Sequence, residues 1–314
     1  MKSTVFYCDA VISKPHGGPY QKFKKLLKRC RWFSTLEKDA TVAVKMHFGE
    51  PGNVRYLRPI WAVLVVEALK EAGCKPFLCD STVLYASPRK QVDTYLQAAY
   101  RHGFHPEVAG CPVVIAGGAD DSIEVNVPSP QLLSKLSMSR IIWDADYFVS
   151  LAHATLHIQF PMASSLKNIG MGCVTSASKR ALHSARGRET IYQSTEAATF
   201  DAARTIIHHF SDRLLAINIG FDITPDCDCF NKSNLPVVPD LGVFISRDPV
   251  AADKAVHDKL VQAPAYPGSI VDGEGDLKGM DKSEIVYPKM VTAKFWEEVE
   301  TAECGSLDYQ IKHL

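Results

Sequence analysis

The chain of 314 residues has nine cysteines but no CxxC motif. Ferredoxin-type iron–sulfur clusters and zinc ribbons depend on CxxC pairs, so neither kind of site has its usual ligands here. The cysteines are odd in number and irregularly spaced, which is not typical of a disulfide framework and favours a reducing compartment. The cysteine pattern therefore predicts neither a 4Fe-4S ferredoxin nor a disulfide-stabilised secreted domain.

Net charge is also absent, because 35 basic residues face 35 acidic ones. Such a balance gives no reason to expect binding to nucleic acid or to an anionic membrane, so any anion must be bound locally. The N-terminal segment does not read as a signal peptide, and the apolar runs are too short to span a bilayer. We expect a cytoplasmic protein with a sizeable core, since 46% of the residues are hydrophobic.

The first half of the chain shows a strand, helix and strand in succession. Residues 41–46 (TVAVKM) and 75–80 (KPFLCD) read as strands, and the apolar residues 58–72 read as the helix between them. This βαβ pattern predicts parallel pairing of the two strands. Similar reasoning predicts strands at 4–8, 111–116, 122–127, 147–152, 214–221 and 241–246, and helices at 20–33, 91–102, 132–142, 197–210, from 249 onward and 291–300. We therefore expect an α/β protein with a mainly parallel sheet and flanking helices, either as one unit of residues 1–314 or as two lobes divided near 145–155.

The segment 150–184 contains no aspartate or glutamate, yet it holds three histidines and two lysines. These are His153, His157, His183, Lys167 and Lys179. Imidazoles bind transition metals and transfer protons near neutral pH, and an ammonium group binds anions or acts as a nucleophile when it is desolvated. A single histidine or lysine is more often an ordinary polar residue. The set of five points instead to a binding or catalytic site.

Other polar residues follow the ends of predicted strands. Lys45 and His47 are two residues apart on one strand, so their side chains should point toward the same face of the sheet. An equally good explanation is that Lys45 is solvated at the edge of the sheet and His47 caps a turn. Asp80, with Tyr85 nearby, ends the next strand and has helix capping as its alternative role. Cys227 and Cys229 can bind a soft metal if further ligands reach them, or can be small buried residues. Ligands of parallel sheets collect beyond the carboxyl ends of the strands, so we expect these loops to share one cleft.

Several motifs together resemble one family of prokaryotic proteins, DUF362. They are VAVKMHFGEPGN (42–53), PFLCDSTVLY (76–85), LKNIGMGC (166–173), KRALHS (179–184), CDC (227–229), DLGVFISRDPVAAD (240–253) and the closing GSLDYQI. The family has no settled activity. Many of its members carry two ferredoxin-type cysteine runs after the histidine that matches His183, whereas residues 184–226 here contain no cysteine. The resemblance therefore implies a short form without the 4Fe-4S insert.

A second, weaker resemblance involves the order of His157, Lys167 and His183, which is similar to that of the lactate racemase family. In that family a lysine carries a nickel-pincer, nicotinamide-derived cofactor. The resemblance implies that Lys167 anchors a cofactor, that His183 ligates the metal, and that His157 acts as acid or base with His47 or His153.

The sequence thus leads to a hypothesis of a metal- or cofactor-dependent enzyme that performs redox or isomerisation chemistry on a small anionic substrate. A non-catalytic metal or cofactor carrier, a racemase-like nickel enzyme and a degenerate relative kept for its fold are the alternatives. The metal would be nickel, zinc or iron, and the sequence does not determine the oligomeric state. The predicted catalytic residues are Lys45, His47, His157 and Lys167; the predicted cofactor-binding residues are Asp80, Tyr85, Lys167, Asn168, Gly170 and Gly172; the predicted metal ligands are His153, His157, His183, Cys227 and Cys229.

Overall fold

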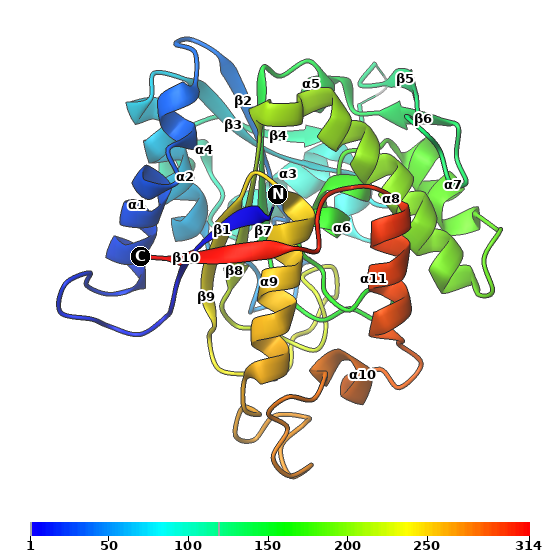
Figure 1. Ribbon diagram of the computed structural model, residues 1–314. Helices are drawn as coiled ribbons and strands as arrows, with labels where there is room; N and C mark the ends of the chain where they lie inside the picture. Colours follow the sequence, from blue (N-terminus) through cyan, green and yellow to red (C-terminus); the bar gives the residue numbers. More distant parts are fainter. Residues whose placement is uncertain (1, 119) are drawn as a thin grey trace.

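The computed structural model describes residues 2–118 and 120–314, and its centre is an eight-stranded sheet of order β10-β1-β9-β8-β7-β2-β3-β4 (Figure 1). The five strands from β8 to β4 pair in parallel, whereas β9 is antiparallel to both of its neighbours. The strands are β1 (Ser3–Cys8), β2 (Thr41–Lys45), β3 (Lys75–Ser81), β4 (Val113–Ala116), β7 (Tyr147–His153), β8 (Leu214–Gly220), β9 (Gly242–Ser246) and β10 (Tyr309–His313). A separate hairpin pairs β5 (Ile123–Asn126) with β6 (Lys135–Met138). The expected α/β class with a mainly parallel sheet is confirmed.

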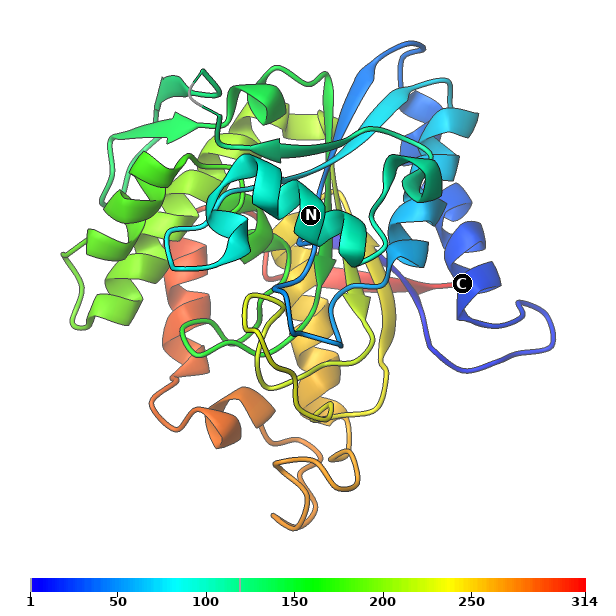
Figure 2. The ribbon, with the colours of Figure 1, turned by 180° about the vertical axis from the view of Figure 1, so that it is seen from behind.

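Helices cover both faces of this sheet (Figures 1 and 2). One layer contains α1 (Pro19–Arg29), α2 (Pro59–Glu71), α3 (Val92–Arg101) and α4 (Pro106–Ala109). The other contains α6 (Ser165–Gly170), α7 (Ser176–Ser184), α8 (Ile191–Phe210), α9 (Pro249–Gln262) and α11 (Thr292–Thr301), with the short α5 (Arg140–Trp143) and α10 (Lys282–Val286) nearby. Alternate strand residues serve the two layers: Val42 and Val44 pack on the first, and Ala43 packs on the second.

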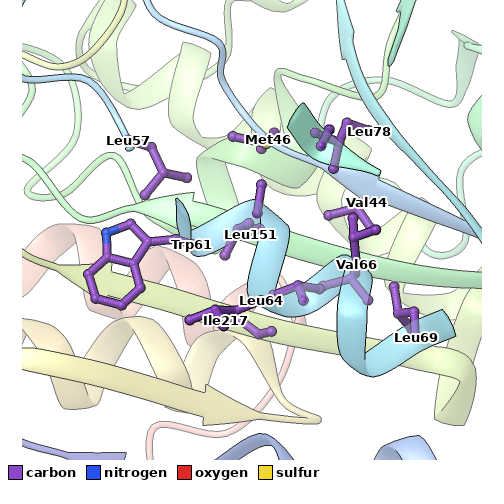
Figure 3. Packing of buried hydrophobic residues seen from close by; sticks show 14 of the residues in the cluster. Val44, Met46, Leu57, Trp61, Leu64, Val66, Leu69, Leu78, Leu151 and Ile217 are labelled. Carbon is purple, nitrogen blue, oxygen red and sulfur yellow. The ribbon is translucent and has the colours of Figure 1, made fainter. Parts of the chain in front are cut away.

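Helix α2 is the element that its apolar sequence predicts will pack against the sheet, and it does so. Figure 3 shows Trp61, Leu64 and Val66 of this helix packed beside the sheet residues Val44 and Ile217. All five side chains are at most 5% exposed. Because a fully buried large apolar side chain contributes about 1.5–3 kcal/mol, this layer fixes the strands whose ends carry the polar loops.

The predicted parallel pairing of 41–46 with 75–80 is confirmed by the register of β2 and β3. The predicted helix at 132–142 is wrong, because residues 135–138 form β6 and only 140–143 are helical. Asp201 of α8 accepts the backbone N–H groups of residues 131, 132 and 133 at 2.7–2.8 Å, which favours an extended chain there. The last strand, β10, was not predicted; it pairs with β1.

Strand β7 lies between β2 and β8, so the sheet continues through residues 147–153. Among the described residues, no helix combines the length and the apolar character needed to cross a membrane.

Candidate functional site

The carboxyl ends of β2, β3, β7 and β8 meet at one cavity of about 540 Å³. Its walls come from the loops that follow these strands and from α6 and α7. The predicted site residues on its walls are Lys45, His47, Asp80, Tyr85, His153, His157, Lys167, Asn168, Gly172, Lys179, His183, Cys227 and Cys229. The expectation that the polar loops share one cleft thus agrees with the structure, and the parallel sheet explains why, since ligands gather at this edge.

A buried charge network forms the floor of the cavity. Lys45 Nζ lies 2.9 Å from Asp80 Oδ1, and Arg89 lies 3.5 Å from Asp80 Oδ2. Arg89 also lies 3.2 Å from Glu50. Burial by itself would raise the pKa of Asp80, but the charges of Lys45 and Arg89 hold it well below its usual range. Asp80 therefore stays ionised and compensates two buried cations.

Glu50 and Arg89 are site residues that the sequence reasoning missed. Glu50 lies in the loop after β2, inside the motif VAVKMHFGEPGN (42–53), and its position in that loop indicates a site residue. Arg89 follows β3 by several residues in the short helix Pro88–Lys90 and carries no sequence signal of its own. The Tyr85 hydroxyl accepts a hydrogen bond from Arg89 at 3.0 Å and lies 3.2 Å from the Cys229 carbonyl. Tyr85 thereby joins this network to the cysteine loop.

Asn168 of α6 orients Lys45. Its Oδ1 accepts from Lys45 Nζ at 2.7 Å, and its amide donates to the Lys45 carbonyl at 3.0 Å. The helix itself is fixed by Asp253, which accepts the backbone N–H groups of Ser165 and Leu166 at 2.9 Å each. Asp253 is buried in α9, so it faces the start of α6 rather than solvent or the cavity. One carboxylate thus positions the helix that carries Lys167 and Asn168.

A group of metal-ligand type lies on one wall of the cavity. A ring nitrogen of His157 and the sulfurs of Cys227 and Cys229 lie within 4.8 Å of one another. His157 is buried, and its ring is oriented by the Gln159 N–H, which donates to Nδ1 at 3.0 Å. Burial, together with the charge of Lys167, lowers the pKa of His157 well below its usual value. The imidazole is therefore neutral, which is the form that ligates metals.

Cys227 and Cys229 are joined by a disulfide bond in this structure. Cys227 Sγ also accepts from the Cys229 N–H at 3.4 Å and from Lys167 Nζ at 3.7 Å. Thiolates, not disulfides, bind metals, so these two sulfurs become ligands only after reduction. The other seven cysteines are free.

His153 does not fit the predicted role of metal ligand. Its Nδ1 lies 2.7 Å from Asp228 Oδ1 and its Nε2 lies 2.6 Å from the Phe221 carbonyl, so both ring nitrogens are engaged. Burial lowers the pKa of His153, but the Asp228 carboxylate more than offsets this and raises it. His153 therefore anchors the 227–229 loop. His183 is exposed at the cavity wall and lies outside the group of three metal-type ligands.

Lys167 and Lys179 are cavity lysines with no carboxylate partner among the described residues. Burial, helped by the charges of Arg89 and Lys45, lowers the pKa of Lys167 to about 8. Burial likewise lowers the pKa of Lys179 to about 7. Both amines can therefore exchange a proton near neutral pH.

His47 has one ring nitrogen available. Its Nδ1 accepts from the Gly49 N–H at 2.9 Å, whereas its buried Nε2 has no protein partner. Burial, with Arg89 and Lys45 nearby, lowers the pKa of His47 well below its usual value. This neutral ring on the cavity wall is suited to proton transfer with a ligand.

The two glycines predicted to bind a cofactor have packing roles. A Cβ on Gly170 would lie 2.3 Å from the Thr199 carbonyl oxygen of α8, so Gly170 permits two helices to touch. A Cβ on Gly172 would lie 2.3 Å from Lys45 Nζ. Gly172 therefore leaves space for the lysine at the edge of the cavity.

Comparison with known proteins gives a family but no activity. The family described as a domain of unknown function (DUF362) matches residues 42–258. No curated protein matches the chain. Two solved structures are similar: a Thermotoga maritima protein (11% identity, TM-score 0.49, 78% of this chain and 59% of that one) and the lactate racemase apoprotein from Thermoanaerobacterium thermosaccharolyticum (13% identity, TM-score 0.42, 71% of this chain and 51% of that one).

The chain spans little more than half the length of either solved protein, and similarity at this level carries no inference about activity. The family match covers more than two thirds of the chain and includes every strand of the cavity edge. This protein belongs to the DUF362 family.

Proposed function

We propose that this chain is a metal-dependent enzyme that acts on a small anionic substrate, with the metal bound by His157, Cys227 and Cys229. The observation that carries the proposal is the convergence of these three side chains, which come from loops seventy residues apart, to within 4.8 Å on a cavity wall. His157 and Cys227 are buried and Cys229 is half-buried, and all three line the cavity, which favours a ligand site over a chance cluster at the surface.

The chemistry of this ligand set supports a soft or borderline metal. Two thiolates and one imidazole suit zinc or nickel, and iron is also compatible with them. Three protein ligands leave a position for substrate or water, which is typical of catalytic rather than structural sites. A bound metal would supply Lewis acidity there, by polarising an oxygen of the substrate.

The surrounding residues give proton-transfer groups and positive charge. Lys167, next to Cys227, has a pKa near 8 and can hold or release a proton beside the metal position. His47, also on the cavity lining, offers its free Nε2. An anionic substrate between these groups would meet an acid and a base, which supports isomerisation by proton transfer, with redox chemistry as the second candidate.

The test is metal analysis of untagged protein purified under reducing conditions without chelator. We expect one zinc, nickel or iron per chain, and loss of that metal in the variants His157→Ala and Cys227→Ser. Cys30→Ser, which changes a half-buried cysteine outside the cavity, is the matched control and should keep the metal. Wild-type protein without metal above background, or a His157→Ala variant with full occupancy, would contradict the proposal.

Two alternatives, a carrier and a racemase-like enzyme, give different results in the same preparation. Lys167→Ala with metal retained should abolish turnover in an enzyme, whereas a carrier would show no activity to lose. Nickel together with added mass on Lys167 would indicate the racemase-like form.

Because the thiols must stay reduced to bind metal, we place the protein in a reducing compartment such as the cytoplasm.

A further inference from the structure

The charges that line the cavity do not all find partners. The basic residues are Lys45, Arg89, Lys167 and Lys179, and the acidic ones are Glu50, Asp80 and Asp228. Asp80 pairs with Lys45, Glu50 pairs with Arg89, and Asp228 pairs with His153. Lys167 lies beside Cys227, whose thiolate would compensate it in the reduced protein. Within the described part of the chain, Lys179 forms no ion pair; the charge of Asp80 acts on it, but Asp80 is already paired with Lys45 and Arg89.

Lys179 is held in place and yet faces the cavity. It is 6% exposed, and its Nζ donates to Ser81 Oγ at 2.8 Å and to the Thr82 carbonyl at 2.5 Å. Ser81 Oγ is itself fixed, because it donates to the Gly172 carbonyl at 2.7 Å. An ammonium has three N–H donors, so two are used by the protein and one remains for a ligand.

His183 extends this position along α7. It lies four residues after Lys179, which places both side chains on the same face of the helix, and both line the cavity. Burial, together with the charges of Lys167 and Lys179, lowers the pKa of His183. A neutral imidazole still offers one N–H donor. The two residues thus present two donors to the same region.

We propose that Lys179 and His183 form the anion subsite of this cavity and bind the carboxylate or phosphate group of the ligand. The inference rests on the proposed function for the rest of the ligand, whose reacting end would lie toward His157 and Cys227, but the subsite itself needs no metal. A bound anion would favour the charged form of Lys179, whose pKa burial lowers to about 7.

A purely structural role for Lys179 is the competing explanation, since its two hydrogen bonds join α7 to the end of β3. A structural role requires two hydrogen-bond donors on the side chain of residue 179 but no positive charge. It gives His183 no part in anion binding. The two explanations therefore differ in whether anion affinity depends on both residues.

The experiment is isothermal titration calorimetry of reduced, chelator-treated protein with inorganic phosphate and, separately, with acetate. We expect one site per chain for at least one of the two anions, and the tighter one identifies a phosphate ester or a carboxylic acid as the ligand class. Lys179→Met should weaken binding by about tenfold or more, the effect of losing one hydrogen bond to a charged group. Lys179→Arg keeps the charge and should bind within a few-fold of wild type.

His183→Ala, which removes the ring donor, is the second variant, and it should fold normally because His183 is exposed. It should weaken anion binding several-fold, a loss that a structural role of Lys179 does not predict. Lys135→Met, at an exposed lysine outside the cavity, is the matched control. Binding of neither anion to wild type, or unchanged affinity in either Lys179→Met or His183→Ala, would overturn the subsite. These outcomes leave the metal site untouched, because metal analysis tests that proposal separately.

Discussion

Replacement of Asp80 by asparagine tests the charge network under the cavity. Asp80 is 3% exposed and compensates Lys45 at 2.9 Å and Arg89 at 3.5 Å. Its carboxylate also accepts from the Tyr95 hydroxyl and from the Ser81 N–H. An asparagine of the same shape keeps one acceptor, removes the negative charge, and turns an N–H₂ group toward a cation.

The expected loss follows from the partners that remain. Removing one member of a buried ion pair costs about 3–5 kcal/mol, because the other charge is left uncompensated. Arg89 keeps Glu50, whereas Lys45 keeps only neutral oxygens from Asn168 and Met46. We therefore expect Asp80→Asn to lower the free energy of unfolding by about 3 kcal/mol, the lower end of that range.

Urea denaturation at pH 7 measures this change. The matched control is Asp308→Asn, since Asp308 pairs with Lys2 at 3.8 Å and the two side chains are 78% and 61% exposed. Exposed pairs contribute at most about 1 kcal/mol, so the control should stay close to wild type. A loss of less than about 1 kcal/mol in Asp80→Asn would refute the assignment of Asp80 as the compensating charge.

The difference in stability between wild type and Asp80→Asn should also depend on pH. The pKa of Asp80 is lower in the folded protein than in the unfolded chain, where it is about 3.9. The folded state thus gains stability from ionised Asp80 above that value and loses it as the pH falls toward the folded pKa. The stability difference between wild type and Asp80→Asn should therefore shrink below about pH 4. A difference that stays constant to lower pH would contradict this reasoning.

Three further predictions follow from other contacts. Gly170→Ala should destabilise the fold by about 1–3 kcal/mol in urea denaturation, because its Cβ would meet the backbone of α8 at 2.3 Å, whereas Gly118→Ala, with open space around it, should have little effect. Asp253→Ala should cost about 2 kcal/mol or more, because it leaves buried N–H groups at the start of α6 without acceptors; wild-type stability in this variant would contradict that role. Mild oxidation should release the bound metal as Cys227 and Cys229 form their disulfide, and a reductant should restore binding; metal content that does not respond to oxidation would exclude these two ligands.

Local sequence patterns determined much of the sheet. Alternation and apolar runs at 41–46 and 75–80 located two neighbouring parallel strands, because residues buried on both faces of a sheet leave a short, strongly hydrophobic signal. The same patterns placed Lys45, Asp80 and His153 at strand ends, and the parallel arrangement was enough to predict a shared cleft. The prediction of a helix at 132–142 was wrong because the conformation of this segment depends on Asp201, a residue far along the chain.

Only the tertiary structure decided which charges compensate one another. The pairing of Asp80 with Lys45 and Arg89, and of His153 with Asp228, joins residues from separate loops whose distance no spacing in the sequence encodes. The roles of the histidines were decided in the same way. Both ring nitrogens of His153 are hydrogen-bonded within the protein. His157, only four residues away in the sequence, instead lies close to two cysteines that follow it by about seventy residues. Sequence specifies which side chains are available at the edge of the sheet, but hydrogen bonds and ion pairs act over a few ångströms, so their assignment follows from packing alone.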